Sequence, residues 1–566
     1  MSKPHLILGV ALLAIITHSA PADAQPSSVA ATNVTDAEIV KMAGAPLFDG
    51  MGTYSRKITT ASEHANRYFN QGMVLAFGFN HAESIRSFRA AQRLDPGCAM
   101  CFWGEALATG PNINVTSKGK AVMSEADRKS AFAAINRALA LKDTATPAEQ
   151  ALIEAQAKRY NGDPATAREP LDLAYADAMD AFVAAYPEDD DAAAIYAEAL
   201  MNTMPWDYWS ADGTAKPETE KVIATLERII ARSPQHPLAL HLYIHAVEAS
   251  SRPGRAEDEA DALANLVPGS GHLVHMPAHI YWRVGRYDDA AKANVRAASV
   301  DEEYIAACNA QGFYPALYYP HNIHFLWAAT SMSGQSQMAL QSARKVAANV
   351  RLEQIEQFPT VEFFKTIPLQ TLAQFGKWPD IMTEPAPPEH LDYSNAIWRY
   401  ARGLAMANMG DINGAQAERA KLAAVKDSVQ IRFLDSADYP ASVLLNIADD
   451  LLQGEIALKS GDPDLAASHF ERAVEKQDSL PYMEPPFWYY PTRQSLGQAL
   501  LEAGRFAEAE AVYRKDLEDY PRNGWSMSGL AAALERQGKM DEAKEAKAAF
   551  AIIWTKADVK INGSRL

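Results

Sequence analysis

Residues 497–521, GQALLEAGRFAEAEAVYRKDLEDYP, decide the fold of this chain of 566 residues. Two alanine-rich helical segments flank a turn at Gly504 and Phe506, and the stretch ends at Pro521. Similar turns, with a glycine followed five residues later by an alanine, occur as GRYDDA at 285, GDINGA at 410, GDPDLA at 461 and GKMDEA at 538. This alternation predicts a series of short antiparallel helices.

The spacing of these residues resembles the tetratricopeptide repeat, a pair of antiparallel helices of about 34 residues. Residues at its characteristic positions occur near both ends of the chain: Tyr68, Gly72, Leu75, Phe88, Ala91 and Pro96, with His81 where a second aromatic is usual, and Gly497, Gly504, Phe506, Ala509, Tyr513 and Pro521. The resemblance implies an all-α fold, a right-handed α-solenoid of helix pairs. It also implies that the glycines and alanines lie where helices touch, while the aromatic side chains fill the space between repeats.

The resemblance covers most of residues 60–555 and is weaker over 100–175 and 340–400. We expect an N-terminal segment at 25–58, a solenoid with a histidine-lined groove at 59–385 and further repeats at 386–560, with a bend or split near residue 385. The chain is also similar to secreted bacterial members of the tetratricopeptide superfamily, a likeness that implies no particular activity.

The first 24 residues have the order of a secretory signal peptide. A lysine precedes an apolar run from Leu6 to Ile16, and small residues end in Ala22-Asp23-Ala24. The run is too short to cross a bilayer, so we expect cleavage after Ala24 and export to the periplasm or outside the cell. Beyond residue 25 no stretch is apolar for long enough to span a membrane.

The net charge of -17 arises without basic clusters. Binding to nucleic acid or to an anionic membrane needs a positively charged surface, so the composition argues against both partners. A small molecule or a peptide in the groove of the solenoid is the expected ligand, and the sequence does not indicate an oligomeric state.

The stretch GHLVHMPAHIYWRVGRYDDA at 271–290 holds three of the chain's 14 histidines. Gly285, with the alanine that follows it at 290, sets the repeat register and predicts a first helix over 271–284. His272, His275 and His279 then take the second, fifth and ninth positions of that helix. In the repeat that this sequence resembles, those positions face the concave groove.

The neighbouring repeats place histidines at the same positions. In the preceding repeat His241 and His245 take the fifth and ninth positions, and Glu248 projects within about 60° of them on the helix. In the following repeat His321 and His324 take the second and fifth positions. A single histidine on an apolar helix face usually only packs, but three neighbouring repeats with one register favour a shared site.

This arrangement predicts a metal site built from His241, His245, Glu248, His272, His275, His279, His321 and His324. Neutral imidazole is a common transition-metal ligand, and Zn(II), Cu(II) or a two-histidine, one-carboxylate iron would each suit the set. Three functions remain open: a ligand-binding protein with a metal in its groove, a metalloenzyme acting as hydrolase or oxidoreductase, and a protein-binding scaffold of the cell envelope without metal. Protonated histidines with Arg283 could instead hold an anion or a peptide.

Cys98 and Cys101 lie where one repeat ends and the next helix begins. After export a local disulfide between them is the first expectation, metal ligation the second and redox catalysis a distant third. Phe102 follows Cys101 where covalent haem attachment requires histidine, which excludes that motif. Cys308 is expected to be a buried free thiol.

Two aromatic stretches, MPWDYW at 204–209 and YMEPPFWYYPTRQ at 482–494, have two interpretations. They could stack on a sugar or apolar ligand, but packing between repeats is the favoured one. The sequence contains neither His-Glu-x-x-His nor Gly-x-Ser-x-Gly, so neither the common metalloprotease motif nor a serine-hydrolase elbow is present.

Overall fold

The computed structural model describes residues 35–117, 120–163, 165–210, 213–308 and 313–566. Within these ranges the fold is α-helical apart from a short antiparallel hairpin of β1 (Thr116–Ser117) and β2 (Lys120–Ala121) and one isolated bridge. The expected signal peptide lies outside the described residues. No helix in the described part of the chain is long and apolar enough to cross a membrane.

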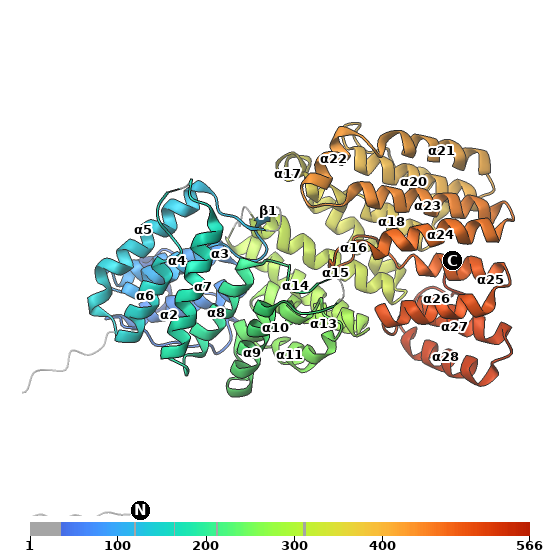
Figure 1. Ribbon diagram of the computed structural model, residues 1–566. Coiled ribbons are helices and arrows are strands. Elements are labelled where there is room, and N and C mark those ends of the chain that lie inside the picture. Colours follow the sequence, from blue (N-terminus) through green and yellow to red (C-terminus); the bar gives the residue numbers. More distant parts are fainter. Residues whose placement is uncertain (1–34, 118–119, 164, 211–212, 309–312) are drawn as a thin grey trace, which may run out of the picture.

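Consecutive helices pair along the whole solenoid (Figure 1). The first part comprises α1 (Asp36–Ala43), α2 (Glu63–Phe77), α3 (His81–Leu94), α4 (Ala99–Thr109), α5 (Glu125–Leu141), η1 (Lys142–Thr144), α6 (Pro147–Ala157), α7 (Arg168–Ala185), α8 (Asp190–Thr203), α9 (Pro217–Arg232), α10 (Pro237–Val247), η2 (Pro253–Ala256) and α11 (Glu257–Leu263). Helix pairs α4/α5 and α6/α7 form even where the sequence match to the repeat is weak.

The middle of the chain comprises α12 (Gly271–His275), α13 (Pro277–Arg283), α14 (Tyr287–Cys308), the π-helix η3 (Tyr314–Tyr318), α15 (Tyr319–Met332), α16 (Ser336–Asn349), α17 (Leu352–Gln357), η4 (Pro359–Lys365), α18 (Ile367–Gln374) and α19 (Trp378–Thr383). The C-terminal part comprises α20 (Asp392–Asn408), α21 (Ile412–Val425), α22 (Val429–Ser436), α23 (Ala441–Lys459), α24 (Pro463–Asp478), α25 (Arg493–Glu502), α26 (Phe506–Asp519), α27 (Gly524–Arg536) and α28 (Met540–Ile553). Helices α18 and α19 pack on α20, across residue 385.

Glycines leave space for the aromatic side chains that pack between neighbouring helices. A Cβ atom added to Gly72 or Gly104 would lie within 2.8 Å or 2.3 Å of the Phe88 ring, which therefore sits between α2 and α4. Gly497 and Gly529 lie equally close to Tyr513, at 2.4 Å and 2.3 Å. The fold is the tetratricopeptide-type α-solenoid that the sequence predicts, and its glycines have the packing role expected of them.

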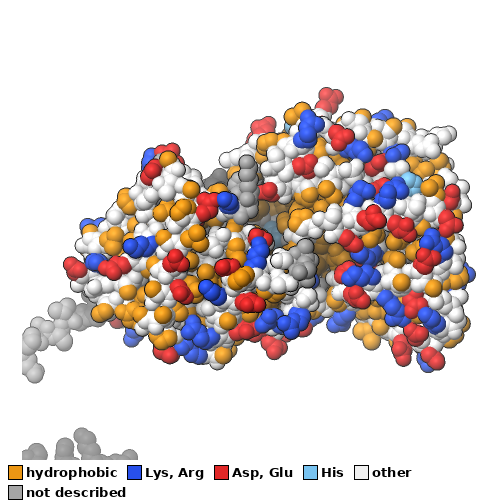
Figure 2. Space-filling model, in the orientation of Figure 1, with side chains coloured by type: hydrophobic (Ala, Val, Ile, Leu, Met, Phe, Trp, Pro, Cys, Tyr) orange, Lys and Arg blue, Asp and Glu red, His pale blue; other side chains and the backbone are white. Residues whose placement is uncertain are grey.

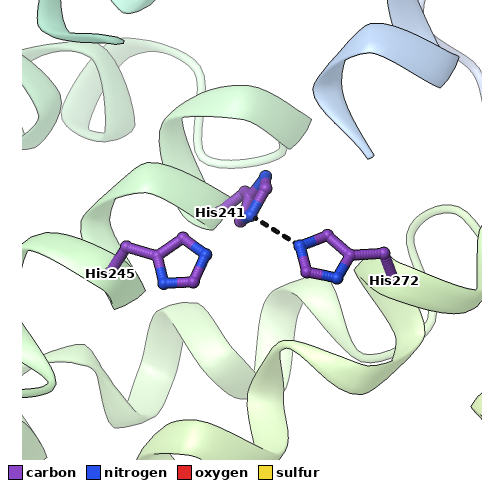
Figure 3. A group of neighbouring side chains, drawn as sticks. All are labelled: His241, His245 and His272. Atoms are coloured by element: carbon purple, nitrogen blue, oxygen red, sulfur yellow. Dashed lines mark hydrogen bonds between the residues drawn. The ribbon is translucent and has the colours of Figure 1, made fainter. Parts of the chain in front are cut away.

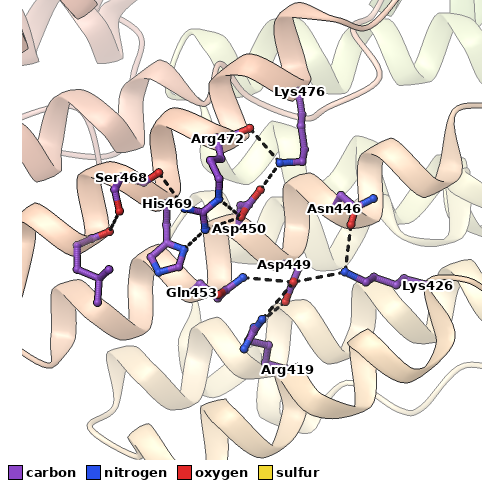
Figure 4. A network of polar contacts seen from close by, with 11 residues as sticks. Arg419, Lys426, Asn446, Asp449, Asp450, Gln453, Ser468, His469, Arg472 and Lys476 are labelled. Carbon is purple, nitrogen blue, oxygen red and sulfur yellow. Dashed lines mark hydrogen bonds and ion pairs between the residues drawn. The ribbon is translucent and has the colours of Figure 1, made fainter.

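Polar contacts connect the helices of the C-terminal part as well (Figure 4). Asp449 and Asp450, adjacent on α23, point to opposite neighbours. Asp449 accepts from Arg419 of α21 at 2.7 Å, and Asp450 accepts from Lys476 of α24 at 2.6 Å. One helix therefore forms ion pairs with the helices on both sides of it.

The C-terminal helices return to the middle of the chain. Trp525 donates its indole N–H to the carbonyl of Ser331 at 3.1 Å, and Asp558 accepts from the backbone N–H of Ser336 at 2.8 Å. Gly285 is so close to the loop before α27 that an added Cβ would lie 2.1 Å from the carbonyl oxygen of Pro521. These contacts place the start of α27 and the tail after α28 beside the ends of α13, α15 and α16, and Figure 1 shows the C-terminal part next to the middle of the chain.

Cys98 and Cys101 are joined by a disulfide, with their Cα atoms 5.4 Å apart. Cys98 is the N-cap of α4, and its sulfur accepts from the backbone N–H of Cys101. Cys308, at the end of α14, is a half-buried free thiol and not the fully buried one expected.

Candidate functional site

Helix α10 carries the first part of the histidine cluster. The side chain of His236 caps its N-terminus and Pro237 occupies the first turn, where a missing N–H costs nothing. Every residue of the helix is buried, His241 and His245 among them, and Glu248 follows at its end with no exposed surface. Helix α10 is therefore buried on all sides, and its histidines lie in the protein interior.

The helix predicted over 271–284 is divided into α12 and α13 at Met276. Pro277 has no backbone N–H to continue the ladder, but Met276 keeps helical angles, so the direction of the chain is preserved. His272 and His275 lie on α12 and His279 lies on α13, all three buried. The helical spacing of His275 and His279 thus persists across the break.

Six imidazoles meet in two groups of three. The first triad is His241, His245 and His272, and the second triad is His275, His279 and His321 of α15. Within each triad one ligating atom from each residue lies within 4.8 Å of the others. His241 Nε2 is 3.2 Å from His272 Nε2, a pair drawn in Figure 3, and His275 Nε2 is 2.9 Å from His279 Nε2.

Four of these histidines have their Nδ1 atom next to a fixed acceptor. His241 Nδ1 donates to the carbonyl of Phe77 at 2.6 Å, and His275 Nδ1 donates to Asn294 Oδ1 at 2.7 Å. The amide of Asn294 is oriented because its Nδ2 donates to the carbonyl of Ala290 at 2.8 Å. Protonation at Nδ1 leaves the Nε2 atoms of neutral His241 and His275 as lone pairs facing the interior of the cluster.

Glu248 orients the other two of these four histidines, His245 and His279. Its Oε1 accepts from His245 Nδ1 at 2.7 Å and its Oε2 accepts from His279 Nδ1 at 2.5 Å. Because both carboxylate oxygens are engaged by Nδ1–H groups, Glu248 is an outer partner of the imidazoles. His245 Nε2 has no hydrogen-bond partner although it is buried.

A second carboxylate comes from the loop between α24 and α25. Glu484 Oε2 lies 3.1 Å from His279 Nδ1, and Tyr482 donates its hydroxyl to Glu484 Oε1. Glu248, His279 and Glu484 form a third buried group with ligating atoms within 4.8 Å. The sequence prediction missed Glu484 because it is more than 160 residues from every histidine of the two triads along the chain, although its aromatic-rich stretch is one of the two with a possible ligand contact.

Burial is the main influence on the charges of the cluster. It lowers the pKa of His241, His272, His275 and His321 well below 6.5, and neighbouring imidazoles add to the effect. Burial opposes a charge on His279 too, but Glu248 and Glu484 together raise its pKa to about 10. Most of the imidazoles are therefore neutral at pH 7, and His279 carries the positive charge.

Each triad lies against one phenylalanine ring. The Phe79 ring centre is 4.6 Å from His241, 6.2 Å from His245 and 5.4 Å from His272. The Phe325 ring centre is 5.0 Å from His275, 4.8 Å from His279 and 5.6 Å from His321. These rings keep water from one side of the imidazoles.

Backbone strain occurs beside the first triad. Phe79 has φ of 55° and Trp206 has φ of 63°, a region that bulky residues rarely adopt. Trp206 meets His245 edge to face at 5.2 Å between ring centres. The aromatic stretch at 204–209, for which packing was the favoured interpretation, thus covers part of the cluster.

His324 was predicted to belong to the site, but it is not in any of these groups. Its ring stacks on Trp327 at 5.0 Å and lies against Phe364 at 5.4 Å, and burial lowers its pKa to about 3. His241 and His275, at the same fifth position, each have a histidine four residues later. Ala328 stands there after His324, so the third repeat lacks the second imidazole of the pair.

A cavity of about 500 Å³ adjoins the second triad. His321 and Glu484 line it together with aromatic side chains of α15, η4 and the loops near 439 and 487, chiefly His324, Trp327, Phe363, Tyr439 and Phe487. No lysine or arginine lines it among the described residues. Figure 2 shows the surface hollowed between the two halves of the molecule, with hydrophobic side chains in the hollow.

Comparison with protein-family models and with curated proteins finds no match. Among solved structures, the chain is similar to a human IFIT1 dimer with m7Gppp-AAAA, with a TM-score of 0.31 and 13% identity over 76% of this chain and 87% of that one. It is also similar to the APC/C hetero-tetramer Cut9-Hcn1, with a TM-score of 0.28 and 12% identity over 88% of this chain and 76% of that one. A third similar structure is the P58(IPK) TPR domain, with a TM-score of 0.22 and 12% identity over 88% of this chain and 99% of that one. The fold assignment rests on the helix pairing and glycine contacts above.

Proposed function

We propose that this protein binds a divalent transition-metal ion through the buried imidazoles of the two triads. The observation that carries the proposal is the orientation of the rings: His241, His245, His275 and His279 each direct Nδ1 to a fixed acceptor, so that each Nε2 is turned toward the cluster. Metal-ligating histidines are held in this way by an outer acceptor at the other ring nitrogen.

The protonation states favour a cation over an anion. Neutral imidazole is the form that binds a metal, and burial keeps the pKa of His241, His272 and His275 well below 6.5. A groove for an anion would need several protonated histidines. His279, whose charge is already paired with Glu248, would exchange its Nε2 proton for the ion.

The donor set favours Zn(II) or copper over a two-histidine, one-carboxylate iron. Each triad offers three nitrogens, while Glu248 uses both oxygens to hold Nδ1–H groups. Two nitrogens bound to one ion at about 2.1 Å lie up to about 4.2 Å apart, and the pairs at 3.2 Å and 2.9 Å are within this limit.

The cavity beside His321 and Glu484 favours a second candidate, a metalloenzyme acting on a small organic molecule. Its volume of about 500 Å³ is in the usual range for small-molecule sites. Aromatic walls and the lack of lysine and arginine among the described lining residues suit an aromatic compound without a negative charge, which would reach the ion from the side of His321.

Export is part of the proposal, resting on the apolar run Leu6 to Ile16 and the small residues before Gln25. Metal loading would then take place outside the cytoplasm.

Metal analysis of purified protein with the double variant His275→Ala, His279→Ala tests the proposal. We expect Zn(II) or copper to copurify or to raise the melting temperature of the wild type, because a ligand that binds only the folded state stabilises it. The double variant should lose the part of this stabilisation that arises at the second triad and keep its helical circular dichroism. The double variant His275→Gln, His279→Gln retains most of the side-chain volume, so the same loss of stabilisation in this variant would not be due to a packing defect.

His324→Ala is the matched control, since it removes a buried imidazole that belongs to neither triad. Its metal content should equal that of the wild type. Wild-type protein that neither contains metal nor responds to Zn(II) or Cu(II) would refute the proposal.

A further inference from the structure

We infer that the cluster holds two metal ions, one in each triad. The inference rests on the proposed metal binding and adds its stoichiometry and its construction. Among the described residues, each of the six histidines belongs to one triad only, and no group combines the two triads. His279 also belongs to the third group, with Glu248 and Glu484, but that group contains no other histidine. Six imidazoles exceed what one ion takes, since zinc sites are almost always four-coordinate.

The repeat generates both sites by one rule. Each triad consists of the fifth-position and ninth-position histidines of one repeat and the second-position histidine of the next. His241 and His245 are completed by His272, and His275 and His279 are completed by His321. Helix α12 therefore serves both sites, since His272 turns to the first triad and His275, one turn later, to the second.

The surroundings are duplicated as well. Phe79 lies within 6.2 Å of all three rings of the first triad, and Phe325 lies within 5.6 Å of all three rings of the second. The triads adjoin one another, with ring centres 5.5 Å apart for His245 and His279 and 5.9 Å apart for His272 and His275. The two ions would accordingly be neighbours.

Glu248 connects the two sites. Its Oε1 accepts from His245 of the first triad and its Oε2 accepts from His279 of the second, whereas His279 is the one imidazole of the two triads that Glu484 contacts. A buried carboxylate requires a neighbouring positive charge, and two carboxylates at the cluster provide countercharge for more than one cation. The two glutamates thus have different expected effects: Glu248 acts on both ions and Glu484 on one.

Two sites predict a defined result when Co(II) is added to metal-free protein. The visible absorption of bound Co(II) should rise to an endpoint at two equivalents in the wild type. His241→Ala with His245→Ala should leave one equivalent, and His279→Ala with His321→Ala should also leave one, with helical content unchanged. The double variant His241→Gln, His245→Gln removes the same two imidazoles but retains most of the side-chain volume, and it should also leave one equivalent.

The glutamates provide a second readout. Glu248→Gln should weaken both binding steps, by about 10- to 100-fold each, and Glu484→Gln should weaken only one of them. An endpoint at one equivalent in the wild type, or loss of both equivalents when either triad is removed, would overturn the two-ion inference while metal binding stands. No Co(II) binding together with no Zn(II) or Cu(II) binding would overturn the proposed function itself.

Discussion

Glu248 shows how much a single residue determines in this cluster. Its side chain is buried and both oxygens accept from imidazole Nδ1–H groups on different helices. His279 and His245 hold its pKa well below the usual range although burial acts in the opposite direction. The carboxylate therefore stays charged, fixes the tautomer of His245 and pairs with the protonated ring of His279.

Asp516 gives the clearest pH dependence away from the cluster. Burial raises its pKa to about 7, above the usual value near 4, despite hydrogen bonds from Ser526 and Asn523. Between these values the folded state holds a proton that the unfolded state has lost, so stability falls as pH rises from about 4 to about 7, by about 1.4 kcal/mol per pH unit. Asp516→Asn should remove this contribution to the pH dependence of the free energy of unfolding, measured by urea unfolding between pH 5 and 7.

Glu475→Gln, at an exposed position of α24, is the control and should leave the slope unchanged. Equal slopes for wild type and Asp516→Asn would mean that Asp516 ionises normally in the folded protein.

At the scale of elements, the interruption at Pro277 shapes the site. It separates α12 from α13 without changing the direction of the helix, and His272, His275 and His279 stay on one inward face. The sequence predicted this face because glycine and alanine set the repeat register. It did not predict that His324 lies elsewhere, since register alone does not show that a triad needs a histidine four residues later.

Gly104 tests the packing between helices. An added Cβ would lie 2.3 Å from the ring of Phe88, which already touches Gly72. Alanine is the better helix former by about 1 kcal/mol, but the clash in a filled core should cost more, about 1–3 kcal/mol. Gly104→Ala should therefore lower the melting temperature, and Phe88→Leu in the same chain should restore part of the loss.

Gly254→Ala is the matched control, because its added Cβ would come no closer than 3.4 Å to Val284. If Gly104→Ala were as stable as this control, Phe88 would not fill the gap between α2 and α4 tightly.

At the scale of the whole molecule, the site depends on the return of the C-terminal repeats to the middle of the chain. Glu484 reaches His279 only because the loop between α24 and α25 lies against α13. The helical repeats could be predicted from local spacing. This long-range contact could not, because Glu484 carries no local pattern and its position depends on the accumulated curvature of every repeat in between.

Gly285→Ala tests this long-range contact without changing a metal ligand. The new Cβ would lie 2.1 Å from the carbonyl oxygen of Pro521 and should push the C-terminal repeats away from α13. Glu484 would then leave His279, and loss of an outer carboxylate should weaken metal binding by about 10- to 100-fold. Gly504→Ala is the control, because its φ of 75° matches the 77° of Gly285 while an added Cβ meets nothing within 4 Å. Both variants suffer the same backbone strain, so only a difference in metal affinity measured by titration reports the contact. Equal affinities would show that the position of Glu484 does not depend on the meeting of the two halves at Gly285.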